Sequence, residues 1–371
     1  MLCHATRVLS LRELNRATLA RQLLLKRSTL SVPDAIAHLA GLQAQHPNSP
    51  YIGLWSRLQG FRRDDLTGLL AQRQVVRATL MRATLHLVTA EDYLLLRPAL
   101  QPALTRALRG FFSQEAKRRD LDRLVAAAQT YTAEQPRTFP ELRAFLSAIE
   151  PNETPQSLSY AVRTHLPLVQ VPPAGTWGCF SIPRYVSAEA WLQRPLASAG
   201  EGLRHLIVRY LAAFGPATRR DIEAWSGLSR LQTTIDELSP TLCSFQDERG
   251  RVLLDLPGLP LPRLEVPAPA RFLPEFDNLL LAHADRTRVL PEEYRSAVLR
   301  PPGRVLATFL VDGIVRGTCR IERARKTAVL VIEPFEPLPE HARDALVAEG
   351  EQLVRFVEDN ATTVATRMRY G

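Results

Sequence analysis

The chain has 371 residues, enough for two or three domains, and carries a formal net charge of +9 at pH 7. Hydrophobic residues make up 46% of it, but no segment approaches the ~18 uninterrupted apolar residues of a membrane-spanning helix, and residues 1–30 hold no apolar signal segment. We therefore exclude a membrane protein, expect a cytoplasmic chain with no membrane partner, and interpret the positive charge as typical of a protein that binds a polyanion.

The sequence contains no pattern typical of a metal or cofactor site. The four cysteines, Cys3, Cys179, Cys243 and Cys319, are widely separated and form no Cys-x-x-Cys pair, so a zinc or iron–sulfur site is not expected. No Gly-rich phosphate loop is present either. All but three of the 47 basic residues are arginine, and a GC-rich genome accounts for that bias but not for the net positive charge. We expect no metal and no cofactor.

One local pattern occurs three times along the chain. A hydroxyl residue is followed three positions later by a carboxylate in Ser31-Val32-Pro33-Asp34, Thr138-Phe139-Pro140-Glu141 and Thr218-Arg219-Arg220-Asp221. Such a pair caps the first turn of a helix, so we expect a helix to begin at each of these places.

Each capped helix has the same neighbours. Helical segments precede them at residues 11–26, 121–134 and 202–214, and pairs of β-like stretches follow at 75–80 and 85–88, at 168–171 and 178–182, and at 242–245 and 251–255. A helix, a capped helix, a further helix and a two-stranded wing form a winged helix-turn-helix. The spacing predicts three tandem copies, at residues 8–96, 97–198 and 199–262.

The character of the sequence changes after about residue 260. Prolines at 257, 260, 262, 267 and 269 predict a linker or an extended strand. Three β-rich runs follow at 304–311, 314–321 and 327–332, with Asp312-Gly313 as a hairpin turn between the first two. An amphipathic helix is expected at residues 339–359. Residues 263–371 are thus predicted to form a β-barrel-like region or a sheet, closed by a helix, and the expected fold class is α+β.

Gln43-Ala44-Gln45 places two neutral amides at the end of an apolar helix predicted for residues 35–42. A glutamine side chain donates and accepts hydrogen bonds and can orient a water molecule, but it holds no charge. If Gln43 and Gln45 form a catalytic site, its chemistry must need no strong acid or base. The spacing alone leaves open the alternative that they are ordinary helix-end residues that bind water or loop carbonyls.

Four further residues are candidates for lining such a site. His46 directly follows the two glutamines, and His86 alternates with apolar residues on a predicted strand. Each can equally be a structural histidine. Asp277 and Asn278 follow an aromatic segment that begins at Phe272, and the alternative for them is a turn, which both residue types favour.

Five basic residues are candidates for DNA binding. Arg286 and Arg288 follow the Asp277 segment, and Arg323, Arg325 and Lys326 form a basic tip between two predicted strands. Basic side chains on loop tips bind phosphates well. The alternative is an ordinary solvated surface.

Several of these segments together resemble the AlkZ/YcaQ family of winged-helix DNA glycosylases. The matching segments are Leu39-x-x-Leu42-Gln43-Ala44-Gln45, Arg82-Ala83-Thr84-Leu85-His86-Leu87-Val88, Phe214-Gly215-Pro216-Ala217-Thr218 with Trp225-Ser226-Gly227-Leu228, and Leu273-Pro274-Glu275-Phe276-Asp277-Asn278. They occur in family order over roughly residues 8–340. The combination is far more specific than any one segment.

The resemblance implies a function as well as a fold. Gln-Ala-Gln is similar to the Gln-x-Gln branch of the family, which is associated with self-resistance to azinomycin B, a compound that cross-links DNA through purine N7 atoms. It implies a DNA glycosylase of base excision repair that removes N7-alkylated purines and unhooks interstrand cross-links. Gln43 and Gln45 are the implied catalytic residues. The implied partner is double-stranded DNA. The implied location of the protein is the cytoplasm, in association with the nucleoid.

This chemistry suits a pair of amides. An N7-alkylated purine is already cationic, so it leaves as a neutral base and needs no proton. The enzyme must stabilise positive charge on the sugar and place a water molecule at C1′, which two amide oxygens can do by electrostatics and orientation. No lysine nucleophile lies near the motif in sequence, so we expect a monofunctional enzyme without lyase activity.

The alternative function is a non-enzymatic winged-helix transcriptional regulator, since three such modules and a basic surface would serve it equally well. A regulator of this kind usually dimerises to bind a palindrome, and the sequence shows no heptad pattern or dimer helix. It also leaves Gln43 and Gln45 without a role. A structural chromatin protein accounts for the charge but not for the C-terminal region. We therefore expect a monomeric enzyme.

Overall fold

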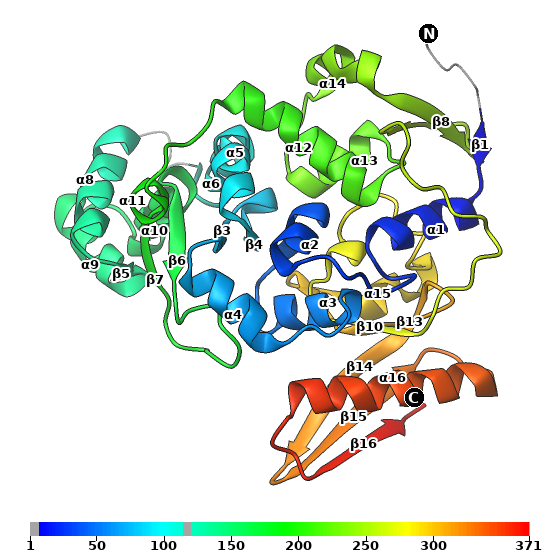
Figure 1. Cartoon of the computed structure of the whole chain (residues 1–371). Helices are drawn as coiled ribbons and strands as arrows, with labels where there is room; N and C mark the ends of the chain where they lie inside the picture. The colour runs from blue at the N-terminus through cyan, green and yellow to red at the C-terminus, as the bar shows by residue number, and fades with distance from the viewer. Residues whose placement is uncertain (1–6, 114–119, 371) are drawn as a thin grey trace.

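Three groups of helices, each followed by two antiparallel strands, succeed one another along the chain, and a region of strands with one long helix follows them (Figure 1). The computed structural model describes residues 7–113 and 120–370, so Cys3 lies outside the described residues. The fold is mixed α+β, as expected.

We call the three groups the first, second and third units. The first contains α1 (Leu11–Arg21), α2 (Val32–His38), α3 (Ser49–Arg57), α4 (Arg63–Ala71), β3 (Val75–Thr79) and β4 (Leu85–Thr89). The second contains α8 (Leu121–Glu134), α9 (Phe139–Ile149), α10 (Pro155–His165), β6 (Leu168–Val171) and β7 (Arg184–Ser187). The third contains α12 (Ala199–Phe214), α13 (Arg219–Ser226), α14 (Gln232–Leu238), β8 (Cys243–Asp247) and β9 (Val252–Asp255). Helices α5 (Ala90–Ala99), α6 (Gln101–Phe111) and α11 (Ala188–Leu192) connect the units.

The expected helix caps are present. Thr138 and Thr218 each form a capping box with the acid three residues further on, and the Ser31 hydroxyl accepts a hydrogen bond of 3.3 Å from the Asp34 backbone N–H. The second and third units have the predicted order of helix, capped helix, helix and two strands, whereas the first has four helices before β3 and β4. That the three units are winged helices that bind DNA stays a prediction.

The strands of the first two units form one sheet. Its order is β2-β4-β3-β6-β7-β5, where β2 is Leu42–Gln43 and β5 is Arg137–Thr138. The two units meet where β3 pairs with β6, at Ala78 and Val169. The second strand of the second unit was expected at residues 178–182, but β7 begins only at Arg184. The reason is that Gly175 and Gly178 both have positive φ angles and turn the chain through an intervening loop.

The third unit has its own sheet, in which β1 (Val8–Leu9) pairs in parallel with β8. A buried core joins this unit to the first, and Leu80 and Met81 of the first unit share it with Tyr210 and Trp225 of the third. The two units therefore pack as one body around the turn between β3 and β4.

The C-terminal region is an open sheet, and the described residues form no closed barrel, so that part of the prediction was wrong. We call it the C-terminal sheet, and its order is β10-β13-β14-β15-β16. Its strands are β10 (Arg271–Leu273), β13 (Thr308–Val311), β14 (Ile314–Ala324), β15 (Thr327–Pro334) and β16 (Thr363–Met368). The sheet stays open because α16 (Glu340–Val357) carries the chain back to place β16 parallel to β15, at the edge opposite β10 (Figure 1).

The expected turn between β13 and β14 is present. Asp312 and Gly313 have φ angles of 46° and 77°, which suits a two-residue hairpin. In the part of the chain that the structure describes, no helix is long and apolar enough to cross a membrane.

Candidate active site

Gln43 lies on a short strand, so the prediction that it ends a helix was wrong. Helix α2 ends at His38, and Gly41 then turns the chain with a φ angle of 83° into β2. A Cβ on Gly41 would lie 2.5 Å from Cγ1 of Val88, so only glycine fits this close approach to β4. As a result Gln43 lies on an edge strand of the six-stranded sheet.

Gln43 is held from two directions and is only 6% exposed. Its backbone N–H donates to Oδ1 of Asn278 at 3.0 Å, and its side-chain Oε1 accepts from Nη2 of Arg82 at 2.7 Å. A guanidinium group has only donors, so the carbonyl end of the Gln43 amide must face Arg82. The orientation of this amide is therefore fixed by its partner.

Gln45 is half-buried and held by its neighbours in the same sheet. Its Oε1 accepts from the backbone N–H of Leu85 at 3.0 Å, which fixes this amide in the same way. The buried Arg77 donates to the carbonyl of Ala44 at 2.6 Å and 2.8 Å and to that of Gln45 at 3.2 Å. Arg77 also donates to Oε1 of Gln170 at 2.5 Å, so the second unit helps to hold the motif.

Arg82 lies in an unusual turn between β3 and β4. Arg82 and Ala83 both have left-handed φ angles, of 55° and 58°, which non-glycine residues adopt at an energetic cost. Besides Gln43, the Arg82 guanidinium donates to the backbone carbonyl of Trp225 in the third unit. Burial, with a contribution from Arg286, lowers the pKa of Arg82 to about 10, so it stays cationic at neutral pH.

Asp277 and Asn278 lie behind the glutamine strand and support it. Asn278 accepts from the Gln43 N–H and donates to the carbonyl of Gly41, so one side chain spans the bend before β2. Asp277 forms a fully buried, bidentate ion pair with Arg57, with N–O distances of 2.7 Å and 2.8 Å. These contacts join the loop after β10 to the first unit.

The two histidines have different surroundings. His86 is fully buried on β4; its Nδ1 contacts the Thr84 carbonyl, and its Nε2 has no partner among the described residues. Burial, with a contribution from Arg82, lowers the pKa of His86 to about 3, so its ring is neutral at physiological pH. His46 is exposed beside the motif, and its Nε2 lies 3.2 Å from Oε2 of Glu275.

Arg286 and Arg288 differ in their access to the surface. Arg286 is half-buried, donates to the Leu280 carbonyl at 2.8 Å and lies close enough to Arg82 to contribute to the lowering of its pKa. Arg288 is 5% exposed and donates inward to Thr18 and to the carbonyl of Pro216. Because the Arg288 guanidinium is occupied inside the protein, we do not retain it among the candidate DNA-binding residues.

The three basic residues of the predicted tip lie on the hairpin of β14 and β15. Arg323, Arg325 and Lys326 are all exposed. Arg323 forms an ion pair of 2.5 Å with Glu358, whereas Arg325 and Lys326 have no side-chain partner in the described part of the chain. The structure does not bring the tip into contact with Gln43 or Gln45.

Two pockets bear on how a ligand could approach. One, of about 310 Å³, lies between the loop after Gln45 and the C-terminal sheet, and its lining includes His46, Phe180, Glu275 and Arg323. It is lined both by the residue that follows Gln45 and by a residue close to the tip of the basic hairpin.

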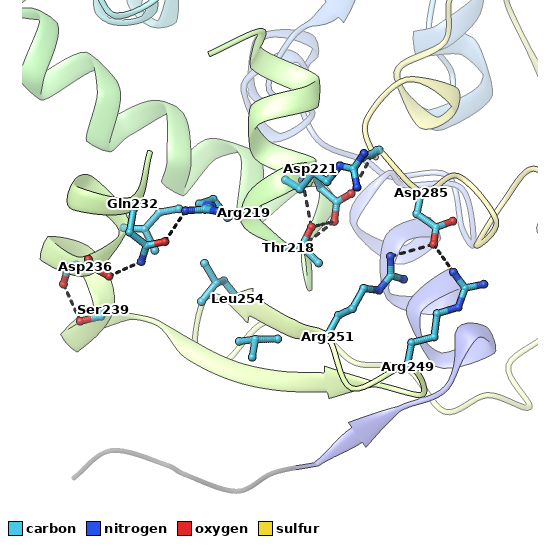
Figure 2. Close-up of a pocket in the computed structure, with 14 residues that line it drawn as sticks. Thr218, Arg219, Asp221, Gln232, Asp236, Ser239, Arg249, Arg251, Leu254 and Asp285 are labelled. Atoms are coloured by element: carbon cyan, nitrogen blue, oxygen red, sulfur yellow. Dashed lines mark hydrogen bonds and ion pairs between the residues drawn. The ribbon is translucent and has the colours of Figure 1, made fainter. Parts of the chain in front are cut away.

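The second pocket, of about 790 Å³, lies between α13, α14 and β9 of the third unit (Figure 2). Arg249 and Arg251 point at Asp285 from 3.1 Å and 3.0 Å, and Arg219 donates to Gln232 at 2.7 Å. Three of its arginines therefore already have partners within the protein, and the glutamine pair does not line it.

The site contains two neutral amides of fixed orientation, those of Gln43 and Gln45, and the positive charge of Arg82 lies beside Gln43. Each glutamine oxygen has two lone pairs, of which one is used by Arg82 or by the Leu85 N–H. No second donor to either oxygen is found among the described residues, so the other lone pair of each oxygen has no protein partner. Within residues 7–113 and 120–370, no cluster of three His, Cys, Asp or Glu side chains is placed to hold a metal ion.

Two residues that build this site are not predicted from the sequence. Arg82 lies in a segment that resembles the family, and Arg77 lies on a predicted strand, but no local pattern indicates that either contacts the glutamines. An arginine inside an otherwise apolar strand, as at Arg77, is the signal that a buried polar partner must exist.

Comparisons with known proteins agree with one another. A family model described as "DNA glycosylase AlkZ-like" matches residues 36–356. The chain is 27% identical over 348 residues to an "Interstrand DNA cross-link repair glycosylase" of Streptomyces sahachiroi, covering 85% of this chain and 88% of that protein. It is similar in structure to the Streptomyces sahachiroi DNA glycosylase AlkZ, with a TM-score of 0.82 at 22% identity, over 98% of this chain and 100% of that one.

Proposed function

The chain belongs to the AlkZ-like family of DNA glycosylases, and on that premise we propose that it excises N7-alkylated purines from duplex DNA and unhooks interstrand cross-links. The family is one of enzymes, so the transcriptional regulator and the chromatin protein are not retained. The observation that carries the proposal is the pair of amides, Gln43 and Gln45, each fixed in orientation by a donor of the protein.

The proposed reaction depends on the charge of the damaged base. Alkylation at N7 makes the purine cationic, so the glycosidic bond breaks to leave a neutral base and a positively charged sugar. The free lone pairs of Gln43 and Gln45 stabilise that sugar and hold a water molecule at C1′. An amide is a poor general base, so orientation supplies most of the rate.

The surroundings of the glutamines suit selectivity for damaged bases. Unmodified purines need a proton to leave, and the two acids of the segment after β10 each have a basic partner: Asp277 pairs with Arg57, and Glu275 lies 3.2 Å from His46. His86 is neutral at physiological pH because burial lowers its pKa to about 3. A site without an available acid acts on cationic bases and leaves ordinary purines intact.

We propose that the enzyme is monofunctional. A lyase step needs an amine that attacks C1′, and no lysine of the described residues contacts Gln43 or Gln45. Lys326 lies at the tip of the exposed hairpin. The product is then an abasic site with the strand unbroken.

Action on cross-links is proposed from the relative in Streptomyces sahachiroi, whose name describes interstrand cross-link repair. A cross-linked base is tethered to the opposite strand and cannot be flipped fully into a deep pocket. Gln43 lies on an edge strand, and His46, the residue after Gln45, lines a pocket together with Arg323 of the basic hairpin. We propose that a monomer binds the duplex there, with Arg323, Arg325 and Lys326 on the phosphate backbone.

The test is release of free base from a duplex with a single N7-methylguanine, measured in single turnover with saturating protein. Gln43→Ala and Gln45→Ala should each slow release by ~10²–10³-fold while affinity for the duplex is retained. Gln72→Ala is the matched control, since Gln72 is exposed at the end of α4 and should have no effect. Equal rates for the wild-type protein and both motif variants would remove the glutamines from the mechanism.

A further inference from the structure

The loop between β6 and β7 carries two large apolar side chains into solvent. Phe180 is 71% exposed and Ile182 is 67% exposed. Single exposed apolar residues are common on protein surfaces, but two at one loop tip beside a polar site are a sign of an interaction surface. The role of this loop is not accounted for by the proposed reaction.

This loop contacts two neighbours of the glutamine motif, Asn48 and Arg77. The backbone N–H of Gly178 donates to Oδ1 of Asn48 at 2.8 Å, and Asn48 precedes α3, three residues after Gln45 in sequence. Gly175 has a φ angle of 83°, and a Cβ there would lie 2.8 Å from Cδ of Arg77. Arg77 is the residue that holds the carbonyls of the motif, so loop and motif share a support.

The docking places Phe180 in one pocket with His46, the residue that directly follows Gln45. Arg323, close to the tip of the basic hairpin, lines the same pocket. An exposed aromatic ring thus shares a pocket with a neighbour of the glutamine motif and with a basic residue of the hairpin. On the proposed function, a duplex bound at both the motif and the hairpin comes close to this ring.

We propose that Phe180, assisted by Ile182, is a wedge that enters the base stack next to the damaged nucleotide. The inference rests on the proposed function of the glutamine pair. A tethered base that cannot be flipped must still be separated from its neighbour for water to reach C1′. Apolar side chains that insert at a base step do this and kink the duplex, and an aromatic ring replaces part of the lost stacking.

The experiment follows base stacking and does not require excision. A duplex carries 2-aminopurine next to an N7-methylguanine whose sugar bears a 2′-fluorine to block hydrolysis. Wild-type protein should raise the fluorescence severalfold as the base step opens, and Phe180→Ala should lose this rise and bind the duplex ~10-fold more weakly. Ile182→Ala should have the same effect to a smaller extent.

The matched control is Phe111→Ala, since Phe111 is 73% exposed at the end of α6 and is not among the residues that line the pocket beside His46. It should leave fluorescence and affinity unchanged. An unchanged fluorescence rise with Phe180→Ala would overturn the wedge, as would a wild-type protein that causes no rise. If the loop instead binds another protein, Phe180→Ala will behave like the control, which also overturns the proposal.

Failure of the wedge is distinguishable from failure of the proposed function. Base release from a hydrolysable duplex that depends on Gln43 but not on Phe180 would overturn the wedge alone. A fluorescence rise that depends on Phe180, without base release by the wild-type protein, would support the wedge and overturn the proposed reaction.

Discussion

The glutamine strand and the basic hairpin are built in opposite ways. Gln43 is almost fully buried and is held by residues from the β3–β4 turn and from the loop after β10. The hairpin of β14 and β15 is held by its own ladder of strand pairs, and its basic side chains are exposed. A group that must be fixed in orientation needs support from several segments, whereas a group that contributes charge needs only to be presented.

The sharpest test of this difference compares two ion pairs. Arg57→Ala removes the partner of the buried Asp277 and should lower the free energy of unfolding by about 3–5 kcal/mol. Arg323→Ala breaks the exposed pair with Glu358 and should change it by about 0–1 kcal/mol. Urea unfolding measures both. Similar losses would show that the two regions do not differ in the way described.

The second-largest effect is expected on the rate of base release. Arg82→Ala frees the Gln43 amide to rotate and should slow base release by ~10–100-fold with little change in affinity. Arg97→Ala is the matched control, because Arg97 is also buried and donates to a glutamine Oε1 and to a backbone carbonyl, those of Gln101 and Thr164.

A double variant shows how Arg82 acts. If it works through Gln43, adding Arg82→Ala to Gln43→Ala should cause no further loss. If the two substitutions lower the rate of base release independently, so that their effects multiply, Arg82 does not act by positioning Gln43. If Arg97→Ala slows base release as much as Arg82→Ala does, the effect of Arg82→Ala reflects a general loss of stability.

The third effect is on pH dependence. Burial lowers the pKa of His86 to about 3, while in the unfolded chain it is about 6.5. The unfolded state therefore binds more protons below pH 6.5, so stability should fall as the pH is lowered from 6.5 toward 4, by at most ~1.4 kcal/mol per pH unit for this group. Thermal unfolding of wild type and His86→Gln measures it, and the variant should show the shallower dependence.

Substitutions in the basic hairpin are expected to have the smallest effect on stability and on the rate of base release. Replacing Arg323, Arg325 and Lys326 by glutamine should leave the melting temperature and the saturated rate of base release unchanged. The slope of log affinity against log salt should become shallower by up to about three. Affinity titrations at several salt concentrations measure this, and an unchanged slope would remove the hairpin from the DNA-binding surface.

This contrast also governs what the sequence could reveal. Local signals predicted the caps at Thr138 and Thr218, and the Asp312-Gly313 turn, because each depends on a few adjacent residues. The α+β fold class was also predicted, because helices and strands each show local sequence patterns. The open edge of the C-terminal sheet was not, because β16 is placed by the packing of a helix rather than by a local turn.

The glutamine motif could be singled out, but its surroundings could not be predicted. A helix was expected through Leu42 because the residues before it are apolar. The contact of Gly41 with Val88, far along the chain, decides that a strand forms instead. The contacts of Arg82 and Asn278 likewise depend on the tertiary fold. Long-range contacts of this kind leave no local pattern.

The pairing of β1 with β8 has a consequence for how the protein folds. Val8 and Leu9 join a sheet whose other strands belong to the third unit, and Arg21 of α1 forms a buried ion pair with Asp255. During synthesis these early residues must wait until most of the chain has been made before they find their partners. Contacts between such distant residues slow folding, and they favour melting of the first and third units as one cooperative transition.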